Sequence, residues 1–218
     1  MRNYIEKIKN ELIKSFNNDY SGHDFEHLER VMNMALFLQK FEGGNKKIIA
    51  ISAYLHDVHR LMQNETGQYV EPRESLNKIV EILNKVDLSK KEVKEICFCV
   101  ENHENYNWNG NNDIKNKNAM ILQDADNLDA LGAIGIARTF AYGGNHNIPM
   151  YIENSETKNF SNYNEKDNVN ETTIEHFYHK LFNLCENMNT KTAKQIADAR
   201  TKFMRKYVDK FLLEWKFK

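Results

Sequence analysis

The segment SAYLHDVH places a histidine and an aspartate, His56 and Asp57, at the end of an apolar run. A buried imidazole or carboxylate without a partner costs free energy, so each side chain needs a hydrogen-bonding neighbour or a metal ion. Adjacent residues on a helix point about 100° apart, so they can meet one ion only at the helix edge. The alternative is a helix end at which His56 interacts favourably with the helix dipole. The dipeptide alone leaves both interpretations open.

Two further histidines lie in the segment GHDFEHLERV. His23 and His27 are four residues apart and therefore share one face of a helix. Arg30 follows His27 by three residues on the same side. Taken alone, His27 is more often a core histidine with a hydrogen-bonding partner than a metal ligand.

Three acidic residues, Asp124, Asp126 and Asp129, are threaded through the apolar segment ILQDADNLDALGAIGIARTF. They are hard to explain as a solvated helix face, so at least one is expected to meet a cation. Two imidazoles and two carboxylates then follow one another along the chain, and this mixed set suits a divalent first-row ion better than a thiolate-selecting zinc site. The set consists of His27, His56, Asp57 and Asp126.

The order H…HD…D resembles the HD-domain superfamily of metal-dependent phosphohydrolases. Four segments also resemble one small bacterial branch of that superfamily with nucleotide-hydrolysing members: DADNLDALGAIGIARTFAYGG, YNEK, HFYHKLFNL and MNTKTAKQIADAR. The resemblance covers nearly the whole chain. It implies one divalent ion, with Mn²⁺ favoured over Mg²⁺, Co²⁺, Ni²⁺, Fe²⁺ or Zn²⁺, and a phosphorylated small molecule, a nucleotide, as the substrate.

The resemblance assigns the metal ligands to His27, His56, Asp57 and Asp126. The last ligand is placed on Asp126 because the family has it in an Ala-Asp-x-Leu setting, which Ala125 to Leu128 reproduce. Asp57 is then a catalytic residue as well as a ligand. Asp124 and Asp129 become candidates that orient the ligands.

Two differences from other branches of the superfamily argue against alarmones and cyclic dinucleotides as substrates. The dyad is followed by Val58-His59-Arg60, without the acidic pair of the alarmone hydrolases, and the Gly-Tyr-Pro signature of the cyclic dinucleotide branch is missing. His59 and Arg60 are interpreted as solvated residues. The expected reaction releases pyrophosphate from a nucleoside triphosphate, and the sequence has no Walker-type GK[ST] loop for a γ-phosphate. The alternatives are a broad phosphatase for monophosphates, a nucleotide-sensing module without turnover, and a di-iron oxygenase with His23 and His103 as extra ligands.

The segment CVENHENYNW ends a predicted helix at His103. This histidine could donate to a substrate phosphate, act as a catalytic general acid, or bind a second metal. A helix-end histidine at the dipole is the structural alternative. For the phosphates of the substrate that the resemblance implies, Arg30 is the best candidate, because it lies one turn from His27. Arg138 and Lys180 are weaker candidates for binding substrate, because charged residues on long helices usually face water.

Helical periodicity dominates the chain and predicts the elements that must position these residues. Ser89 and Glu92 have capping-box spacing before an apolar run. The segments 105–115 and 144–170 are rich in Asn and Gly and are expected to be loops. The fold class is therefore all-α, a single HD-type bundle over residues 1–218. Helices are expected near 2–17, 25–41, 46–58, 73–86, 90–104, 116–142, 172–188 and 190–216.

The composition is that of a globular protein, with 41% hydrophobic and 28% charged residues among 218. A net charge of −1 leaves no broad basic field, which disfavours duplex nucleic acid as a partner. No apolar stretch approaches the ~20 residues of a membrane span, and the N-terminus does not have the pattern of a signal peptide. Three cysteines cannot complete a disulfide framework, so a reducing cytoplasm is expected. A homodimer is compatible with these features.

Overall fold

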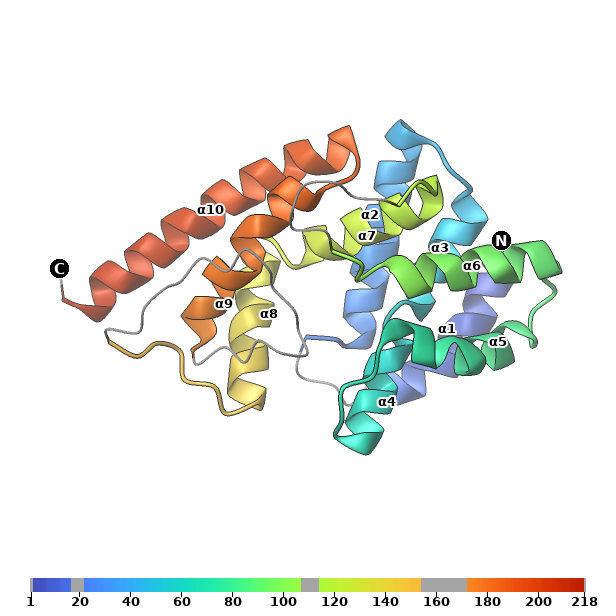
Figure 1. The fold of residues 1–218 in the computed structure, drawn as a ribbon, viewed down its shortest axis with the longest axis horizontal. Helices are drawn as coiled ribbons and strands as arrows, with labels where there is room; N and C mark the ends of the chain where they lie inside the picture. The colour runs from blue at the N-terminus through green and yellow to red at the C-terminus, as the bar shows by residue number, and fades with distance from the viewer. Residues whose placement is uncertain (1, 17–21, 107–113, 154–171, 218) are drawn as a thin grey trace. The chain divides into compact units, whose positions relative to one another are not determined.

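The computed structural model describes residues 2–16, 22–106, 114–153 and 172–217, and these are helical with no strand among them (Figure 1). The all-α prediction is confirmed. The first helices are α1 (Arg2–Phe16), α2 (Phe25–Glu42), α3 (Lys46–Leu55), α4 (Val58–Thr66), η1 (Pro72–Ser75), α5 (Leu76–Leu83) and α6 (Lys90–Asn102). They are followed by α7 (Lys117–Asp129), α8 (Gly132–Asn145), α9 (Thr173–His179), η2 (Leu181–Asn187) and α10 (Lys191–Trp215). Most of the predicted loop residues, and the YNEK segment, lie outside the described ranges.

The chain forms two compact units. The first comprises residues 1–19, 23–105 and 113–126, and the second comprises residues 20–22, 106–112 and 127–218. Helices α1 to α6 and most of α7 belong to the first unit, while α8, α9, η2 and α10 belong to the second. A single folding domain over the whole chain stays a prediction.

Helix α3 forms the centre of the first unit. Every residue from Ile48 to Leu55 is buried, and the helix packs against α2 and α6. A helix that is apolar around its whole circumference is typical of a core position. Asn45 caps its N-terminus, where its side chain accepts hydrogen bonds from the backbone of Lys47 and Ile48. The C-terminal end of α3, which leads into His56, is therefore buried inside the first unit.

The predicted helix over 46–58 ends earlier, at Leu55. His56 and Asp57 form a turn, and a helix that was not predicted, α4, begins directly afterwards at Val58. Helix α4 is short and closes at Gly67, whose φ of 67° lies in the left-handed region that glycine favours. The His-Asp pair thus lies at a junction between two helices, where both side chains can face the same space.

The predicted helix over 116–142 is two helices, α7 and α8. Leu131 is extended, and Gly132 has a φ of 76°, a value that no residue adopts within a right-handed helix. The chain therefore turns before α8 begins. A Cβ on Gly135 would lie 2.1 Å from the carbonyl oxygen of Ala130, so this turn also requires glycine inside the first turn of α8.

The second unit is built around the long helix α10, which packs on α8 and η2. An aromatic cluster joins α8, α9 and α10, with Phe140 at 6.1 Å from Phe177 and 5.8 Å from Phe211 between ring centroids. The predicted helix over 172–188 is the α-helix α9 followed by the 3₁₀-helix η2. Thr172 and Glu175 form a capping box at its start.

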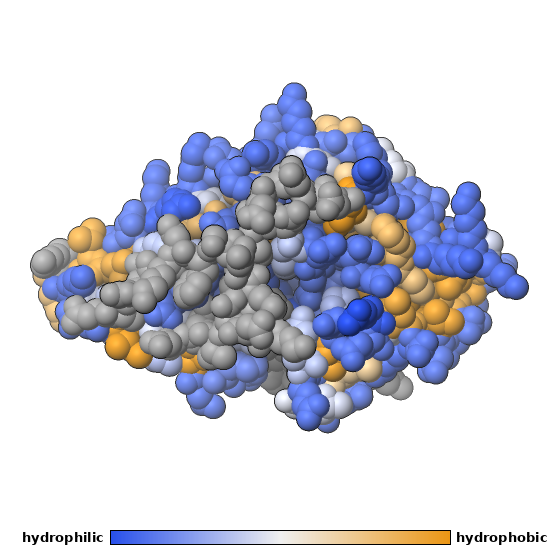
Figure 2. Space-filling view, in the orientation of Figure 1, coloured by the Kyte–Doolittle hydropathy of each residue, from blue (hydrophilic) through white to orange (hydrophobic). Residues whose placement is uncertain are grey.

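Hydrophilic residues cover most of the described surface on the face shown in Figure 2. Among the described residues, none of the helices combines the length and the apolar character that crossing a bilayer requires.

Candidate metal centre

His56 ends α3 with its imidazole completely buried. Its Nδ1 atom lies 2.8 Å from the carbonyl oxygen of Ala53, to which it donates. A proton on Nδ1 leaves the lone pair on Nε2, which is the tautomer that a metal ligand needs. The junction between α3 and α4 thus turns this lone pair toward the interior of the first unit.

His27 comes from the first turn of α2 and is equally buried. The side chain of Asp24 caps this helix by accepting a hydrogen bond from the backbone N–H of His27, at 2.7 Å. The Nε2 atom of His27 lies 3.1 Å from Nε2 of His56 and 3.3 Å from Oδ2 of Asp57. Two consecutive helices therefore present their imidazoles to one point from positions 29 residues apart in the chain.

Asp126 on α7 completes this group. Its Oδ1 atom lies 3.4 Å from Nε2 of His27 and 3.6 Å from Nε2 of His56. Asp124, two residues earlier, is also buried, but among the described residues the clusters of potential ligands contain Asp126 and not Asp124. The geometry therefore supports the choice of Asp126 from its Ala-Asp-x-Leu setting.

The donor atoms of His27, His56 and Asp126 lie within 4.8 Å of one another and form one potential ligand group, which Asp57 approaches through Oδ2 toward His27 and Oδ1 toward His56. Ligands bonded at about 2.0–2.2 Å in adjacent positions lie about 2.8–3.6 Å from one another. The five separations that involve His27 Nε2 or His56 Nε2 in this set run from 3.1 to 3.6 Å. Two imidazoles and two carboxylates form a harder, more oxygen-rich set than a thiolate site and suit first-row divalent ions.

The electrostatics of the site favour positive charge. Burial alone lowers the pKa of His56, but the carboxylates of Asp57 and Asp126 outweigh this effect and raise that pKa to about 9. Burial likewise opposes ionisation of Asp57, yet the adjacent His56 and His23 hold its pKa well below the usual range. Charged carboxylates that are kept ionised inside a protein create a site that attracts a cation.

His23 also reaches this site. Its Nδ1 atom lies 2.8 Å from Oδ2 of Asp57, and its ring is half-buried. The sequence suggested His23 only as an extra ligand of a di-iron centre. The structure places it as a hydrogen-bonding partner of Asp57, where it can fix the orientation of the carboxylate.

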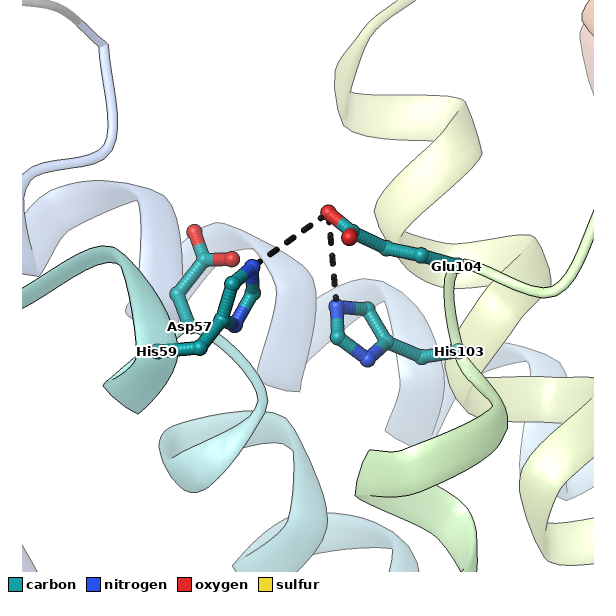
Figure 3. A group of neighbouring side chains, drawn as sticks. All are labelled: Asp57, His59, His103 and Glu104. Carbon is teal, nitrogen blue, oxygen red and sulfur yellow. Dashed lines mark ion pairs between the residues drawn. The ribbon is translucent and has the colours of Figure 1, made fainter. Parts of the chain in front are cut away.

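A second group of side chains lies next to Asp57 and contains His59, His103 and Glu104 (Figure 3). The interpretation of His59 as a solvated residue is wrong, because its side chain is completely buried. Arg60 is mostly covered too, with its side chain 14% exposed, and it forms an ion pair with Glu104. The position of His59 two residues after Asp57 was a signal in the sequence that it could belong to the site, whereas no sequence feature distinguished Glu104.

His103 caps the end of α6 and is completely buried. Its Nδ1 atom lies 2.6 Å from the carbonyl oxygen of Val100, to which it donates. Burial lowers the pKa of His103 to about 4, so the ring is neutral at pH 7. A neutral ring with its proton on Nδ1 offers a lone pair at Nε2. Of the three roles considered for His103, this state favours a metal ligand over a proton donor.

The three basic candidates for substrate binding differ in their surroundings. Arg30 lies in α2, three residues after His27, and is half-buried. Arg138 belongs to the second unit, where its Nη1 lies 3.0 Å from Asp129 Oδ2 and its Nε donates to the carbonyl oxygen of Gly22. Lys180, also in the second unit, lies 5.3 Å from the ring centroid of Tyr106. Arg138 therefore has a structural role in its own unit, and Asp129 is paired with it.

Comparison with known proteins agrees with this geometry. The family model of the HD domain matches residues 24–131, a range that contains all four candidate ligands. A solved HD-superfamily hydrolase from Bacillus thuringiensis is 33% identical, with 100% of this chain and 99% of that chain covered and a TM-score of 0.72. A solved protein from Lactobacillus plantarum is 31% identical, with the same coverage and a TM-score of 0.79.

Bacillus subtilis YpgQ is a further relative, 26% identical over 207 residues, which are 93% of this chain and 89% of YpgQ. YpgQ has been solved in complex with ADP, and that structure superposes with a TM-score of 0.67 at 24% identity over 95% of both chains. These relatives span both compact units.

Proposed function

The chain belongs to the HD superfamily of hydrolases, and from this premise we propose that it converts nucleoside triphosphates to monophosphates and pyrophosphate with a bound divalent metal ion. The observation that carries the proposal is the approach of two carboxylate groups, at 3.3 to 3.6 Å, to the Nε2 atoms of His27 and His56, which lie 3.1 Å apart in the interior of the first unit. Burying such a group of polar atoms costs free energy unless hydrogen-bonding partners or a bound cation compensate for the lost water.

In this proposal His27, His56, Asp57 and Asp126 hold one ion, with Mn²⁺ favoured. A bound divalent ion lowers the pKa of a coordinated water and neutralises charge on a phosphoryl group. The chain contributes the placement of the ligands. The hydrogen bond from His56 Nδ1 to Ala53 directs Nε2 of the same ring toward the ion, and His23 holds one oxygen of Asp57 in a fixed direction.

The reaction we propose is attack of water on the α-phosphorus. The water oxygen forms the new bond to the α-phosphorus, the α–β bridging oxygen leaves with pyrophosphate, and the proton that the water loses passes to the solvent. The departing group carries several negative charges, which cations must balance. Arg30 is the stronger candidate for this task, because it lies one helical turn from His27, whereas Arg138 is already paired with Asp129. Binding of phosphate by Arg138 and Lys180 is a weaker part of the proposal.

One observation supports a nucleotide as the substrate, and a second bears on which phosphate bond is cleaved. The relative YpgQ binds ADP in its solved structure. The sequence also lacks a Walker-type glycine loop, so a conventional cradle for γ-phosphate transfer is missing. Cleavage between the α- and β-phosphates is the choice that follows the resemblance. A cytoplasmic setting belongs to the same proposal and is supported by three unpaired cysteines, Cys97, Cys99 and Cys185.

Product analysis tests the proposal. The protein is stripped of metal with a chelator, reloaded with Mn²⁺, Mg²⁺, Co²⁺ or Zn²⁺, and mixed with deoxynucleoside and ribonucleoside triphosphates. Early time points are separated by ion-exchange chromatography. We expect monophosphate and pyrophosphate in equal amounts, and none without metal. Accumulation of diphosphate, or free phosphate that precedes pyrophosphate, would contradict the proposed scissile bond.

Three other results would point to the alternatives. Hydrolysis of monophosphates at comparable rates would indicate a broad phosphatase. Tight nucleotide binding without turnover, under every metal tried, would indicate a sensing module. Isolation of the protein with two iron ions, together with consumption of oxygen, would indicate an oxygenase.

A further inference from the structure

A second set of potential ligand atoms lies beside the candidate metal centre and has no part in it. It consists of the side chains of His59 from α4 and of His103 and Glu104 from the end of α6, next to Asp57 (Figure 3). One ligand atom from each of these four residues lies within 4.8 Å of the others. All four belong to the first unit.

The two histidines point bare lone pairs into this space. His59 Nδ1 lies 3.1 Å from the carbonyl oxygen of His56, and His103 Nδ1 lies 2.6 Å from that of Val100. Because a carbonyl only accepts, the proton of each neutral ring must be on Nδ1. Both Nε2 atoms are buried and have no hydrogen-bond partner. Buried polar atoms in folded proteins are almost always satisfied, so these two nitrogens indicate a ligand.

The charge of the surroundings indicates which kind of ligand. Glu104 Oε1 lies 3.6 Å from His59 Nε2 and 3.9 Å from His103 Nε2, and these distances are drawn as dashed lines in Figure 3. Lone pairs and carboxylate oxygens repel an anion and attract a cation. Arg60 is paired with Glu104, but a carboxylate has two oxygens with several acceptor sites and can serve both partners.

We propose that His59, His103 and Glu104, together with Asp57, bind a second divalent cation. Two imidazoles with carboxylates suit a first-row transition ion better than Mg²⁺ or Ca²⁺, which prefer all-oxygen sites. Asp57 is common to both groups of ligands, with Oδ2 facing His27 and Oδ1 nearer His56 and Arg60. It can therefore bridge two ions, as carboxylates do in two-metal phosphotransfer sites.

This inference adds a site to the proposed metal centre but does not depend on the substrate or on turnover. Its test is a measurement of metal content. Metal-free protein is equilibrated with excess Mn²⁺, passed through a desalting column, and analysed for manganese per chain by mass spectrometry. Electron paramagnetic resonance of the same samples distinguishes an isolated Mn²⁺ from a coupled pair.

The variants are chosen to remove the ligand and keep the fold. In His59→Asn and His103→Asn the amide N–H can replace the Nδ1 donor, while the Nε2 lone pair is lost. Glu104→Gln keeps the size and an acceptor for Arg60 but removes the charge. The matched control is His146→Asn, an exposed histidine whose Nδ1 also faces a backbone carbonyl, that of Tyr142 at 2.9 Å. Thermal melting of each variant establishes that it is folded.

We expect about two ions per wild-type chain and a coupled Mn²⁺ signal. Each of the three variants should fall to about one ion and show an uncoupled signal, and His146→Asn should match the wild type. One ion in the wild type, unchanged in His103→Asn and Glu104→Gln, would overturn the inference and leave a buried water as the partner of the two nitrogens. Two ions that persist in both variants would also overturn it, because the second ion would lie elsewhere.

The outcomes separate this inference from the proposed function. Pyrophosphate release by a protein with one ion per chain would leave the proposed function standing and remove the second site. Two ions without any nucleotide turnover would do the reverse.

Discussion

The Nε2 atoms of His27 and His56 lie 3.1 Å apart in a part of the first unit where both rings are completely buried. Two neutral imidazoles that meet through unprotonated nitrogens repel each other, so a proton or a metal ion must lie between their lone pairs. The carboxylates of Asp57 and Asp126 flank the same point. The close approach of these two nitrogens, from α2 and from the end of α3, is the reason for proposing the metal centre at this point.

Replacement of Asp57 by asparagine should abolish nucleotide hydrolysis. The substitution keeps the shape of the side chain and the contact with His23, but it removes a charged ligand from the proposed ion. We expect a loss of roughly 10³-fold or more in kcat/KM, which corresponds to about 4 kcal/mol of transition-state stabilisation. The measurement is steady-state kinetics at saturating Mn²⁺. Asp198→Asn, at an exposed aspartate of α10, is the control, and retained turnover in Asp57→Asn would count against the mechanism.

A substitution of Arg30 distinguishes between two roles for this residue, binding a substrate phosphate and facing the solvent. If its guanidinium grips a phosphate through two N–H groups, Arg30→Lys should lower kcat/KM for a triphosphate, because an ammonium group cannot reproduce the two-pronged contact. An effect of about 10-fold or more is expected, with little change in the melting temperature. The control is Lys40→Arg at the exposed end of the same helix. Equal kinetics for Arg30→Lys and the wild type would remove Arg30 from the substrate site.

The stability of the metal-free protein should fall on acidification because of His103. Its pKa is lowered from 6.5 to about 4 by burial, so the unfolded chain takes up this proton at a higher pH than the folded chain does. Stability from this group is therefore complete above pH 6.5 and is lost as the pH falls toward 4, by roughly 2–3 kcal/mol. Urea unfolding in the presence of a chelator between pH 7 and pH 4 measures it. His103→Asn should show a shallower decline, and identical slopes would contradict the assignment.

Gly132 should be required for the break between α7 and α8. An alanine there would have to adopt a φ of 76°, and its Cβ would lie 3.1 Å from Cγ of Arg200. We expect Gly132→Ala to destabilise the protein by about 1–2 kcal/mol, seen as a lower melting temperature. Gly144→Ala is the matched control, since it lies in α8 with open space around its Cβ and should be neutral or slightly stabilising. Similar melting temperatures for both variants would contradict this role of Gly132.

Periodicity in the sequence was sufficient for the helical fold class, whereas the four positions of the candidate metal centre were chosen through the resemblance to the HD superfamily. Polar residues on otherwise apolar helices, such as His27 and the aspartates from Asp124 to Asp129, leave a pattern that the chain itself displays, but this pattern does not say which of them share a site. The breaks at His56 and at Gly132 were missed, because each depends on a few backbone dihedral angles between two apolar runs rather than on periodicity.

The cluster of His59, His103 and Glu104 was also not predicted, and the reason differs from that for the helix breaks. His59 and Glu104 are more than 40 residues apart and are brought together only by the packing of α3 against α6, with α4 and Glu104 at the ends of these helices. A histidine followed by an arginine, as in His59-Arg60, has the pattern of an exposed helix face. Burial of that face is a tertiary effect, and local sequence does not encode it.

The most direct test of the metal centre is a crystal structure of the protein with Mn²⁺, analysed by anomalous scattering at the manganese edge. The account predicts a strong anomalous peak bonded to Nε2 of His27 and His56 and to carboxylate oxygens of Asp57 and Asp126, at about 2.0–2.3 Å. No peak among these four side chains at saturating Mn²⁺, with ordered metal elsewhere on the protein, would contradict it.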